Sequence, residues 1–262
     1  LWALLTNSYL AGFARGKIYQ GKLKNLCVPG LNCYSCPGAL GACPIGAVQA
    51  VIGSWNFKLA FYAAGFLMFV GALAGRFVCG WLCPFGLIQD LLHKIPFPEK
   101  IGTFRGDRLL RKLKYVILIV FVILLPMFLV DVLGQGAPYF CKLICPAGTL
   151  EGGIPLVLLN ESMRSALGWL YAWKNVLLLI TIVLSVMIYR PFCKYICPLG
   201  AVYSVFNPVS VFRYRVDEKK CTGCGICAKV CGMQVDPAEN ANHPECIRCG
   251  ACKKSCPVKA IH

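Results

Sequence analysis

Residues 221–231 read CTGCGICAKVC, and residues 246–256 read CIRCGACKKSC. Both runs have the spacing C-x2-C-x2-C-x3-C, and Pro257 follows the second run. In proteins that use this spacing for two [4Fe–4S] clusters, the fourth cysteine of each run binds the cluster of the other run. The sequence therefore predicts one cluster on Cys221, Cys224, Cys227 and Cys256, and a second on Cys246, Cys249, Cys252 and Cys231.

The paired runs are typical of the bacterial two-cluster ferredoxins. Gly232 stands where that pattern usually has proline, which changes the local turn but removes no ligand. Two four-cysteine zinc sites are the alternative, but zinc requires only paired C-x2-C units and neither a third cysteine nor a remote fourth. We expect a small α+β ferredoxin domain over residues 211–262, folded largely by the clusters that it binds.

The rest of the chain is strongly apolar. Charged residues are 15% of the sequence and hydrophobic residues 58%, whereas an average soluble protein has about 25% charged residues. Windows 57–75, 115–133 and 167–189 approach or exceed the ~20 residues of a membrane span, with a kink expected at Pro126. Buried core helices of a soluble protein are the alternative, but soluble chains rarely hold three such runs. With residues 1–14 as the end of a further helix, we predict a membrane all-α domain of about four transmembrane helices over residues 1–210.

The distribution of lysine and arginine predicts an orientation. Residues 76–114 contain eight of them, and residues 134–166 contain two. Because positive loops stay in the cytoplasm, the first connection and the ferredoxin domain should face inward in a multi-pass protein of a bacterial or archaeal cytoplasmic membrane. Residues 15–56 should face outward, although they carry four basic residues and no acid. The net charge of +16 is spread along the chain without a nucleic-acid-binding motif, so we expect no nucleic-acid partner.

A repeated motif, C-x3-C-P-x-G, follows three of the predicted spans. The copies begin at Cys79, Cys141 and Cys193, and a weaker relative begins at Cys33. Cysteines four apart lie on one face of a helical turn, the proline can start the next helix, and the glycine lets the backbone approach a bulky group. Each copy offers two thiolates and a cubane cluster needs four, so two copies must converge.

The predicted helix directions decide which copies converge. The second and fourth predicted helices run the same way, so the sequence predicts a third cluster on Cys79, Cys83, Cys193 and Cys197, on the cytoplasmic side. Reduced, buried structural cysteines are the alternative there. The outer side has six candidates, and the shared C-P-x-G ending favours a fourth cluster on Cys36, Cys43, Cys141 and Cys145, with Cys27 and Cys33 as alternates. Disulfides are the alternative on that side, because that compartment can be oxidising.

The remaining polar residues exclude several other functions. The three histidines, His93, His243 and His262, lie outside the predicted spans, so a haem held by two transmembrane histidines is not expected. Phosphate-binding and dinucleotide-binding motifs are missing from the sequence, so no nucleotide is expected. No nucleophile or acid–base pair can be named, and no catalytic residue is predicted. The chemistry should be one-electron transfer, as in an electron-transfer subunit of an oxidoreductase complex.

At these motifs the chain resembles the polyferredoxin-type membrane proteins with 4Fe–4S motifs. That family includes NapH, the membrane ferredoxin subunit of periplasmic nitrate reduction, and the carboxy-terminal half of the nitrous-oxide respiration regulator. The resemblance covers residues 57–262 and rests on FVCGWLCPFGLIQDLL, RPFCKYICPLGAVYS and the two ferredoxin runs. The copy at Cys141 and the cysteines of residues 25–49 are additional to the two-motif minimum of the family, which argues for a further cluster on the outer side.

The resemblance also implies partners. It implies a membrane-bound carrier that links a cytoplasmic ferredoxin or flavoprotein donor to a membrane or extracytoplasmic acceptor, such as a quinone or a flavin-binding protein. A maturation or metal-reducing factor for a respiratory enzyme is the alternative function. The scarcity of methionine, with five in the chain, favours the electron carrier over metal handling.

Overall fold

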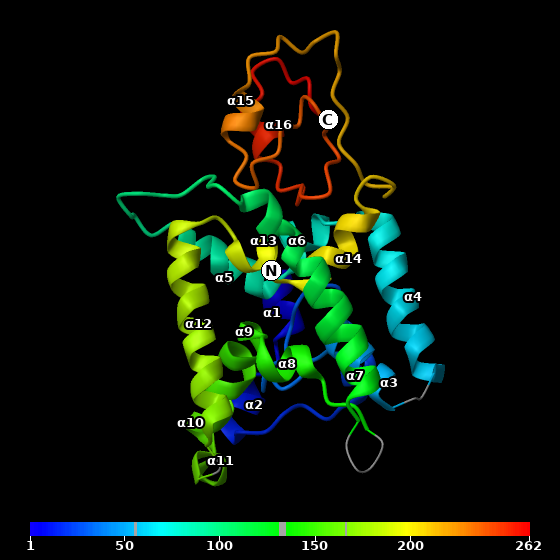
Figure 1. Cartoon of the computed structure of the whole chain (residues 1–262), viewed down its shortest axis with the longest axis vertical. Coiled ribbons are helices and arrows are strands. Elements are labelled where there is room, and N and C mark those ends of the chain that lie inside the picture. The colour runs from blue at the N-terminus through cyan, green and yellow to red at the C-terminus, as the bar shows by residue number, and fades with distance from the viewer. Residues whose placement is uncertain (55–56, 131–134, 166) are drawn as a thin grey trace.

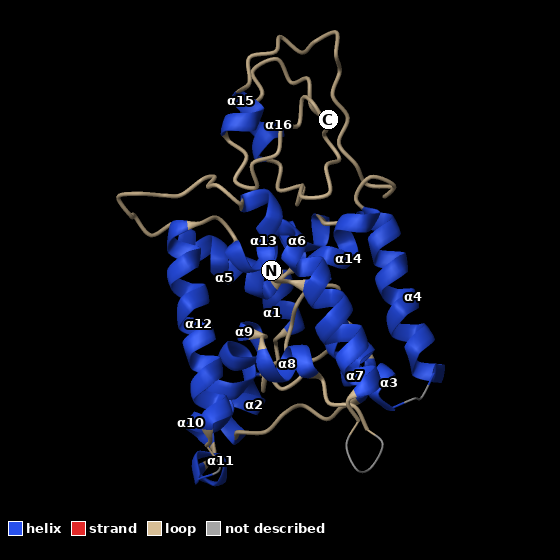
Figure 2. Cartoon of the chain, viewed as in Figure 1, coloured by secondary structure: helices blue, strands red, loops and turns tan. Residues whose placement is uncertain are grey.

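The computed structural model describes residues 1–54, 57–130, 135–165 and 167–262 of the chain. Helices form a lower part, and a loop-rich carboxy-terminal part stands on one end of it (Figure 1). The described residues contain helices and loops but no strand (Figure 2).

The amino-terminal half has short helices on either side of one long one. Its elements are α1 (Trp2–Thr6), α2 (Leu10–Arg15), the 3₁₀ helix η1 (Lys22–Asn25), α3 (Pro44–Ser54), α4 (Phe57–Ala74), the π-helix η2 (Val78–Leu82), α5 (Pro84–His93), α6 (Asp107–Ile117), the π-helix η3 (Leu118–Leu124) and α7 (Leu125–Phe128). The second half contains α8 (Tyr139–Leu143), α9 (Pro146–Gly148), the π-helix η4 (Thr149–Gly153), α10 (Ile154–Leu159), α11 (Glu161–Ser165), α12 (Trp169–Met187), α13 (Pro191–Tyr195), α14 (Pro198–Phe206), α15 (Ile226–Lys229) and α16 (Ala251–Ser255).

The predicted fold class, about four transmembrane helices followed by an α+β domain, is wrong. Within the described residues, α12 is the one helix both long enough and apolar enough to cross a membrane. The first predicted helix, over residues 1–14, is split into α1 and α2. The side chains of Thr6 and Asn7 donate hydrogen bonds to the carbonyls of Trp2 and Ala3, and such side-chain bonds compete with continuation of a helix.

The two central windows also differ from the prediction. In the first, the fully described part of α4, Phe61–Ala74, is shorter than a span. In the second, the helix widens into η3 and then ends at Phe128, and part of the predicted span, residues 131–133, lies outside the described residues. Pro126 cannot donate a backbone hydrogen bond to the preceding turn, and the π-helical turns occur directly before it.

The carboxy-terminal part lacks the strands expected of an α+β domain. Its described residues contain one isolated antiparallel bridge, between Val216 and Ile261. Arg215 and His262 exchange backbone hydrogen bonds of 2.8 and 3.0 Å beside that bridge. Elsewhere the chain turns repeatedly between closely spaced cysteines, with Gly225 and Gly250 at positive φ, and this leaves no run of extended residues long enough for a ladder.

One apolar core extends from the helical part into the base of the carboxy-terminal part. It contains cysteines from three different segments, Cys43, Cys79 and Cys197, together with Ile247 from the carboxy-terminal part. The cysteine motifs of the helical part therefore belong to the packed core of the molecule.

Candidate iron–sulfur sites

The first predicted set lies in the carboxy-terminal part, in and before α15 and near the end of the chain. The four sulfurs of this set line one cavity of about 90 Å³: Cys221, Cys224, Cys227 and Cys256. Three of these residues come from the first run and the fourth from the second, in the combination that the spacing predicts. Their role as ligands stays a prediction, which this arrangement supports.

The second predicted set surrounds a smaller cavity beside α16. That cavity, of about 20 Å³, is lined by Cys231, Cys246, Cys249 and Cys252. Again one cysteine of the other run completes the set. All eighteen cysteines of the chain lie within the described residues, and all are free of disulfides.

The thiols of the two sets differ in environment. Burial raises the pKa of the Cys252 thiol to about 11. Cys224 is exposed, and a hydrogen bond from the backbone N–H of Ile226 lowers the pKa of its thiol. Because iron binds thiolates, a buried thiol such as that of Cys252 must lose its proton as the metal binds. The set that contains Cys224 is the one that reaches the surface.

The third predicted set is buried in the helical part. Cys79 lies in η2 and Cys193 in α13, and Cys83 and Cys197 are the N-cap residues of α5 and α14. None of the four is more than 9% exposed, and the two motifs are joined by Gln89 of α5, whose Nε2 donates to Cys193 Sγ at 3.2 Å. We call this arrangement the inner site.

The C-P-x-G sequence explains how the inner site forms. Pro84 and Pro198 begin their helices, where the missing N–H costs nothing. The N–H of Gly86 donates to Cys83 Sγ at 3.4 Å, and that of Gly200 donates to Cys197 Sγ at 3.5 Å. Each sulfur therefore sits at the amino end of a helix, which favours a negatively charged thiolate.

Two buried arginines border the inner site, and sequence reasoning missed both. Arg76 donates to the carbonyl of Cys193 at 3.1 Å, and Arg190 donates to the carbonyl of Cys79 and pairs with Asp90. Both guanidinium groups are fully buried or nearly so. Each arginine stands three residues before the first cysteine of its motif, a repeat that could have identified them. Their charge offsets that of a group held by four thiolates.

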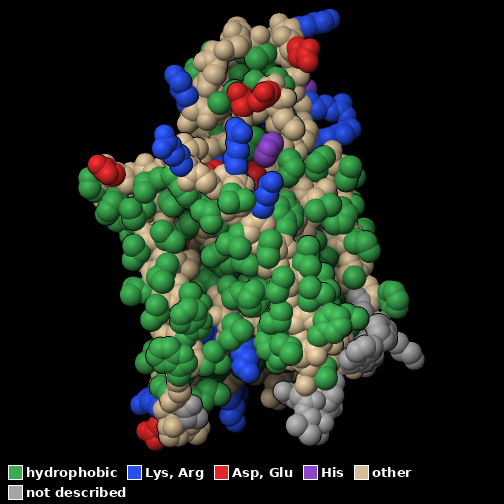
Figure 3. All heavy atoms as spheres, viewed as in Figure 1, with side chains coloured by type: hydrophobic (Ala, Val, Ile, Leu, Met, Phe, Trp, Pro, Cys, Tyr) green, Lys and Arg blue, Asp and Glu red, His purple; other side chains and the backbone are tan. Residues whose placement is uncertain are grey.

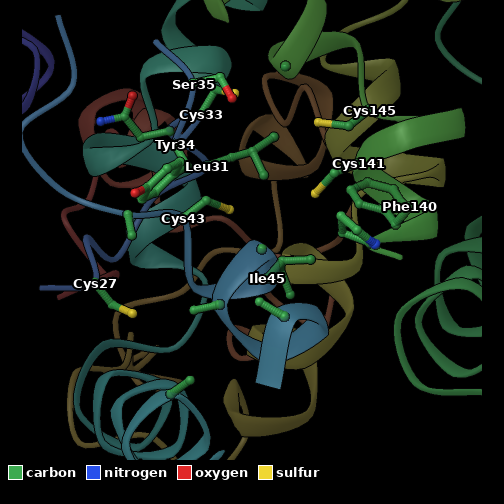
Figure 4. A pocket seen from close by; sticks show the side chains of 18 of the residues that line it. Cys27, Leu31, Cys33, Tyr34, Ser35, Cys43, Ile45, Phe140, Cys141 and Cys145 are labelled. Carbon is green, nitrogen blue, oxygen red and sulfur yellow. The ribbon is translucent and has the colours of Figure 1, made fainter. Parts of the chain in front are cut away.

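On the far side of the helical part is a larger cavity, of about 410 Å³ (Figure 4). Its lining includes five of the six predicted outer cysteines, Cys27, Cys33, Cys43, Cys141 and Cys145. The predicted ligand Cys36 is not among the lining residues, and its sulfur lies 3.7 Å from Asn7 Oδ1. The structure thus brings the alternate, Cys33, to the cavity and places Cys36 to one side. We call this cavity and its cysteines the outer site.

The cysteines of the two carboxy-terminal sets and of the outer site line cavities, and their side chains do not converge on a single point. In the described ranges, no group of three or more His, Cys, Asp or Glu side chains is arranged to hold a single metal ion. The cavities of the first carboxy-terminal set and of the outer site are each lined by at least four cysteines, the number of thiolate donors that a four-iron cluster requires.

The sites follow one another through the molecule. A Cβ atom on Gly80, next to Cys79, would lie 2.3 Å from the carbonyl oxygen of Ile247, in the second carboxy-terminal run. Trp81 Nε1 donates to the carbonyl of Arg248 at 3.1 Å. The inner site is therefore packed directly against the second predicted set.

Comparison with known proteins agrees with this chemistry. A family described as a 4Fe-4S binding domain matches residues 41–61, 58–105 and 171–216, and another family with that description matches residues 214–234 and 242–262. The chain belongs to the ferredoxin-type 4Fe-4S proteins. The predicted resemblance is thereby confirmed. The matched ranges of this ferredoxin-type chain contain the two carboxy-terminal sets and the inner site, but they leave out Cys33, Cys141 and Cys145.

Three relatives show how far the similarity extends. An uncharacterized protein of Methanocaldococcus jannaschii is 30% identical over 66% of this chain and 65% of its own length. The regulatory protein NosR of Stutzerimonas stutzeri is 28% identical over 66% of this chain and 22% of its own length. The ferredoxin-type protein NapH of Haemophilus influenzae is 27% identical over 64% of this chain and 52% of its own length. The ferredoxin-type chain thus spans less than two thirds of each of these relatives. No solved structure matches it.

Proposed function

We propose that this chain is a membrane-bound electron-transfer protein that passes electrons between a cytoplasmic donor and an acceptor on the other side of the membrane. The observation that carries the proposal is the succession of four cysteine-lined sites from the exposed end of the carboxy-terminal part to the outer site. Bound [4Fe–4S] clusters would supply one-electron chemistry at each site.

The closeness of the inner and outer sites supports a continuous path. A Cβ atom on Gly30 would lie 2.9 Å from the Cα atom of Cys83, so this segment packs against the inner site. The next two residues, Leu31 and Asn32, line the outer cavity. The fully buried Tyr203 of α14 donates a hydrogen bond to the carbonyl of Pro29, beside Gly30, at 2.9 Å.

The surface of the helical part supports placement in a membrane. Large apolar side chains cover its middle, and charged side chains gather toward the two ends (Figure 3). We call this surface the apolar belt. It is formed by α4, by the continuous helix from α6 to α7, and by α12. Its exposed residues include Phe61, Phe69, Val116, Ile119, Phe128, Trp173, Leu179 and Val183. Soluble monomers rarely expose a contiguous apolar patch beyond about 300–600 Å², so a lipid bilayer is the occupant that we propose for it.

The positions of the terminal sites support the choice of partners. At one end, the set with Cys224 is open to solvent and accessible to a soluble donor, such as a cytoplasmic ferredoxin or flavoprotein. At the other end, the outer site lies beyond the inner site and would face a quinone or an extracytoplasmic flavin-binding partner. The chain's own residues bury the inner site and partly bury the second carboxy-terminal set, which limits the access of water and unselected oxidants to them.

Transfer across a bilayer is the direct test of this function. The purified chain in sealed liposomes, with ferricyanide trapped inside and a reduced ferredoxin added outside, should bleach the trapped ferricyanide severalfold faster than protein-free liposomes. The same protein stripped of iron serves as the control and should give the background rate. If the loaded protein also gives the background rate, transmembrane transfer fails and the maturation role becomes the better reading.

The orientation can be tested separately. Because most basic residues of the first half lie in residues 76–114, on the side of the carboxy-terminal part, that part should be cytoplasmic. Green fluorescent protein fused after His262 should fluoresce in cells, and alkaline phosphatase at the same position should be inactive. An active phosphatase fusion would reverse the orientation and place the donor outside the cell.

A further inference from the structure

The outer site is built from the same parts as the inner site. In the inner site, Cys83 precedes α5, and Gln89 follows six residues after Cys83. In the outer site, Cys43 precedes α3, which begins at Pro44, and Gln49 again follows six residues after the cysteine. The two segments share the pattern C-P-x-G-x-x-Q, although α3 and α5 occupy different ends of the helical part (Figure 1).

The two glutamines make the same pair of hydrogen bonds. Gln89 Nε2 donates to Cys193 Sγ at 3.2 Å, and Gln89 Oε1 accepts from the N–H of Phe192 at 3.2 Å. Gln49 Nε2 donates to Cys141 Sγ at 3.3 Å, and Gln49 Oε1 accepts from the N–H of the residue before it, Phe140, at 2.9 Å. Both glutamine side chains are buried.

A cation occupies the same place in both sites. Arg76 donates to the carbonyl of Cys193 at 3.1 Å, and Lys174 Nζ donates to the carbonyl of Cys141 at 3.1 Å. Lys174 belongs to α12. Its contact with the backbone of a cysteine matches the contact that Arg76 makes at the inner site. The two sites therefore share three independent contacts.

The fourth corner of the outer site is occupied by Cys33. A Cβ atom on Gly148, the glycine of the Cys141 motif, would lie 3.6 Å from Cys33 Sγ and 4.0 Å from Cys145 Sγ. The two sulfurs therefore face the same small space, which an alanine side chain would fill. Cys27 also lines the cavity, but it lies apart from the other labelled cysteines in Figure 4.

We propose that Cys33, Cys43, Cys141 and Cys145 hold a [4Fe–4S] cluster in a second copy of the inner site, and that Gln49 and Gln89 are equivalent positioning residues. The proposal rests on the proposed electron-transfer function and names the end of its path. Each glutamine donates a hydrogen bond to one ligating sulfur and is anchored by a backbone N–H. Such a bond favours the more negative, reduced state of a cluster, so it raises the reduction potential of the site.

Iron content tests the ligand set, with two neighbouring cysteines as a matched pair. The wild-type chain should contain about sixteen iron atoms, four for each of four clusters. Cys33→Ser should lose about four of them, whereas Cys36→Ser should keep all of them. Loss of iron in Cys36→Ser with full iron in Cys33→Ser would overturn the set in favour of Cys36. About twelve iron atoms in the wild type, with outer thiols that only a reductant frees, would show disulfides in place of a cluster.

The glutamines give a second readout that does not require loss of a ligand. In EPR-monitored redox titrations, Gln49→Leu and Gln89→Leu should each lower the midpoint potential of one signal, and the two signals should differ. A shift of the same signal by both variants, or of none by Gln49→Leu, would overturn the equivalence. If iron and potentials behave as expected but trapped ferricyanide is not reduced, the outer cluster stands and the transmembrane function fails.

Discussion

Cys197→Ser is expected to remove about four of the roughly sixteen iron atoms per chain and to abolish electron transfer across liposomes. Cys197 is one of the four buried cysteines that form the inner site. The inner site lies between the carboxy-terminal part and the outer site, so its loss interrupts the path in the middle. The EPR signals of the two carboxy-terminal sets should remain.

Serine is the informative replacement because it preserves the local fold. Cys197 is the N-cap of α14 and its sulfur accepts the N–H of Gly200. Serine is a favoured N-cap residue, so α14 should still form while the iron ligand is lost. Cys27→Ser provides the matched control, since Cys27 is buried like Cys197 but lies apart from the other labelled cysteines in Figure 4. Full iron and full transfer in Cys197→Ser would show that this thiol is not a ligand.

The pairing of the carboxy-terminal cysteines could be predicted from spacing alone. Ligand geometry determines which cysteine of one run must reach the other, and the structure places Cys256 with the first run and Cys231 with the second. The grouping of the four inner-site cysteines could also be proposed from the sequence, because two copies of one motif on the same side offer four thiols. The spacing within each run and motif is stated directly by the sequence, whereas the grouping of the two motifs also required the predicted helix directions.

Other features depend on contacts that spacing does not reveal. A shared Cys-Pro dipeptide favoured Cys36, but Pro37 begins no helix, whereas Pro44 begins α3 and directs Cys43 into the cavity. The first predicted helix failed because Thr6 and Asn7 bond to the preceding turn. Arg76 pairs with Glu245, and Lys174 donates to the carbonyl of Cys141; both partners are more than thirty residues away in the sequence. Hydropathy does not predict such contacts.

Glu245→Ala is expected to reduce the free energy of unfolding by about 3–5 kcal/mol, because it leaves two buried cations without a partner. Glu245 Oε2 accepts from Arg76 Nη1 at 2.6 Å, and Glu245 Oε1 pairs with Lys114. Both cations are 0% exposed, and Glu245 is 5% exposed. This cluster joins the carboxy-terminal part to the helical part, so the variant should loosen their contact and slow transfer to the inner site.

The same ion pairs predict a pH dependence. Burial raises the pKa of Glu245, but Arg76 and Lys114 outweigh it and hold the pKa below its ordinary value. A carboxyl whose folded pKa is lowered stabilises the fold above its unfolded pKa of about 4.3, and this contribution is lost as pH falls through the folded pKa. The stability difference between wild type and Glu245→Ala should therefore be full near pH 7 and shrink in acid.

Denaturant unfolding in detergent, followed by loss of the iron–sulfur absorbance, measures the effect. Glu239→Ala is the matched control, because Glu239 lies in the same part of the chain but is exposed. It should unfold at nearly the wild-type midpoint, since exposed ionic interactions contribute about 0–1 kcal/mol. Equal midpoints for the two variants would show that the buried ion pairs contribute little net stability. The contact of Ile247 with Gly80 would then be what holds the carboxy-terminal part in place.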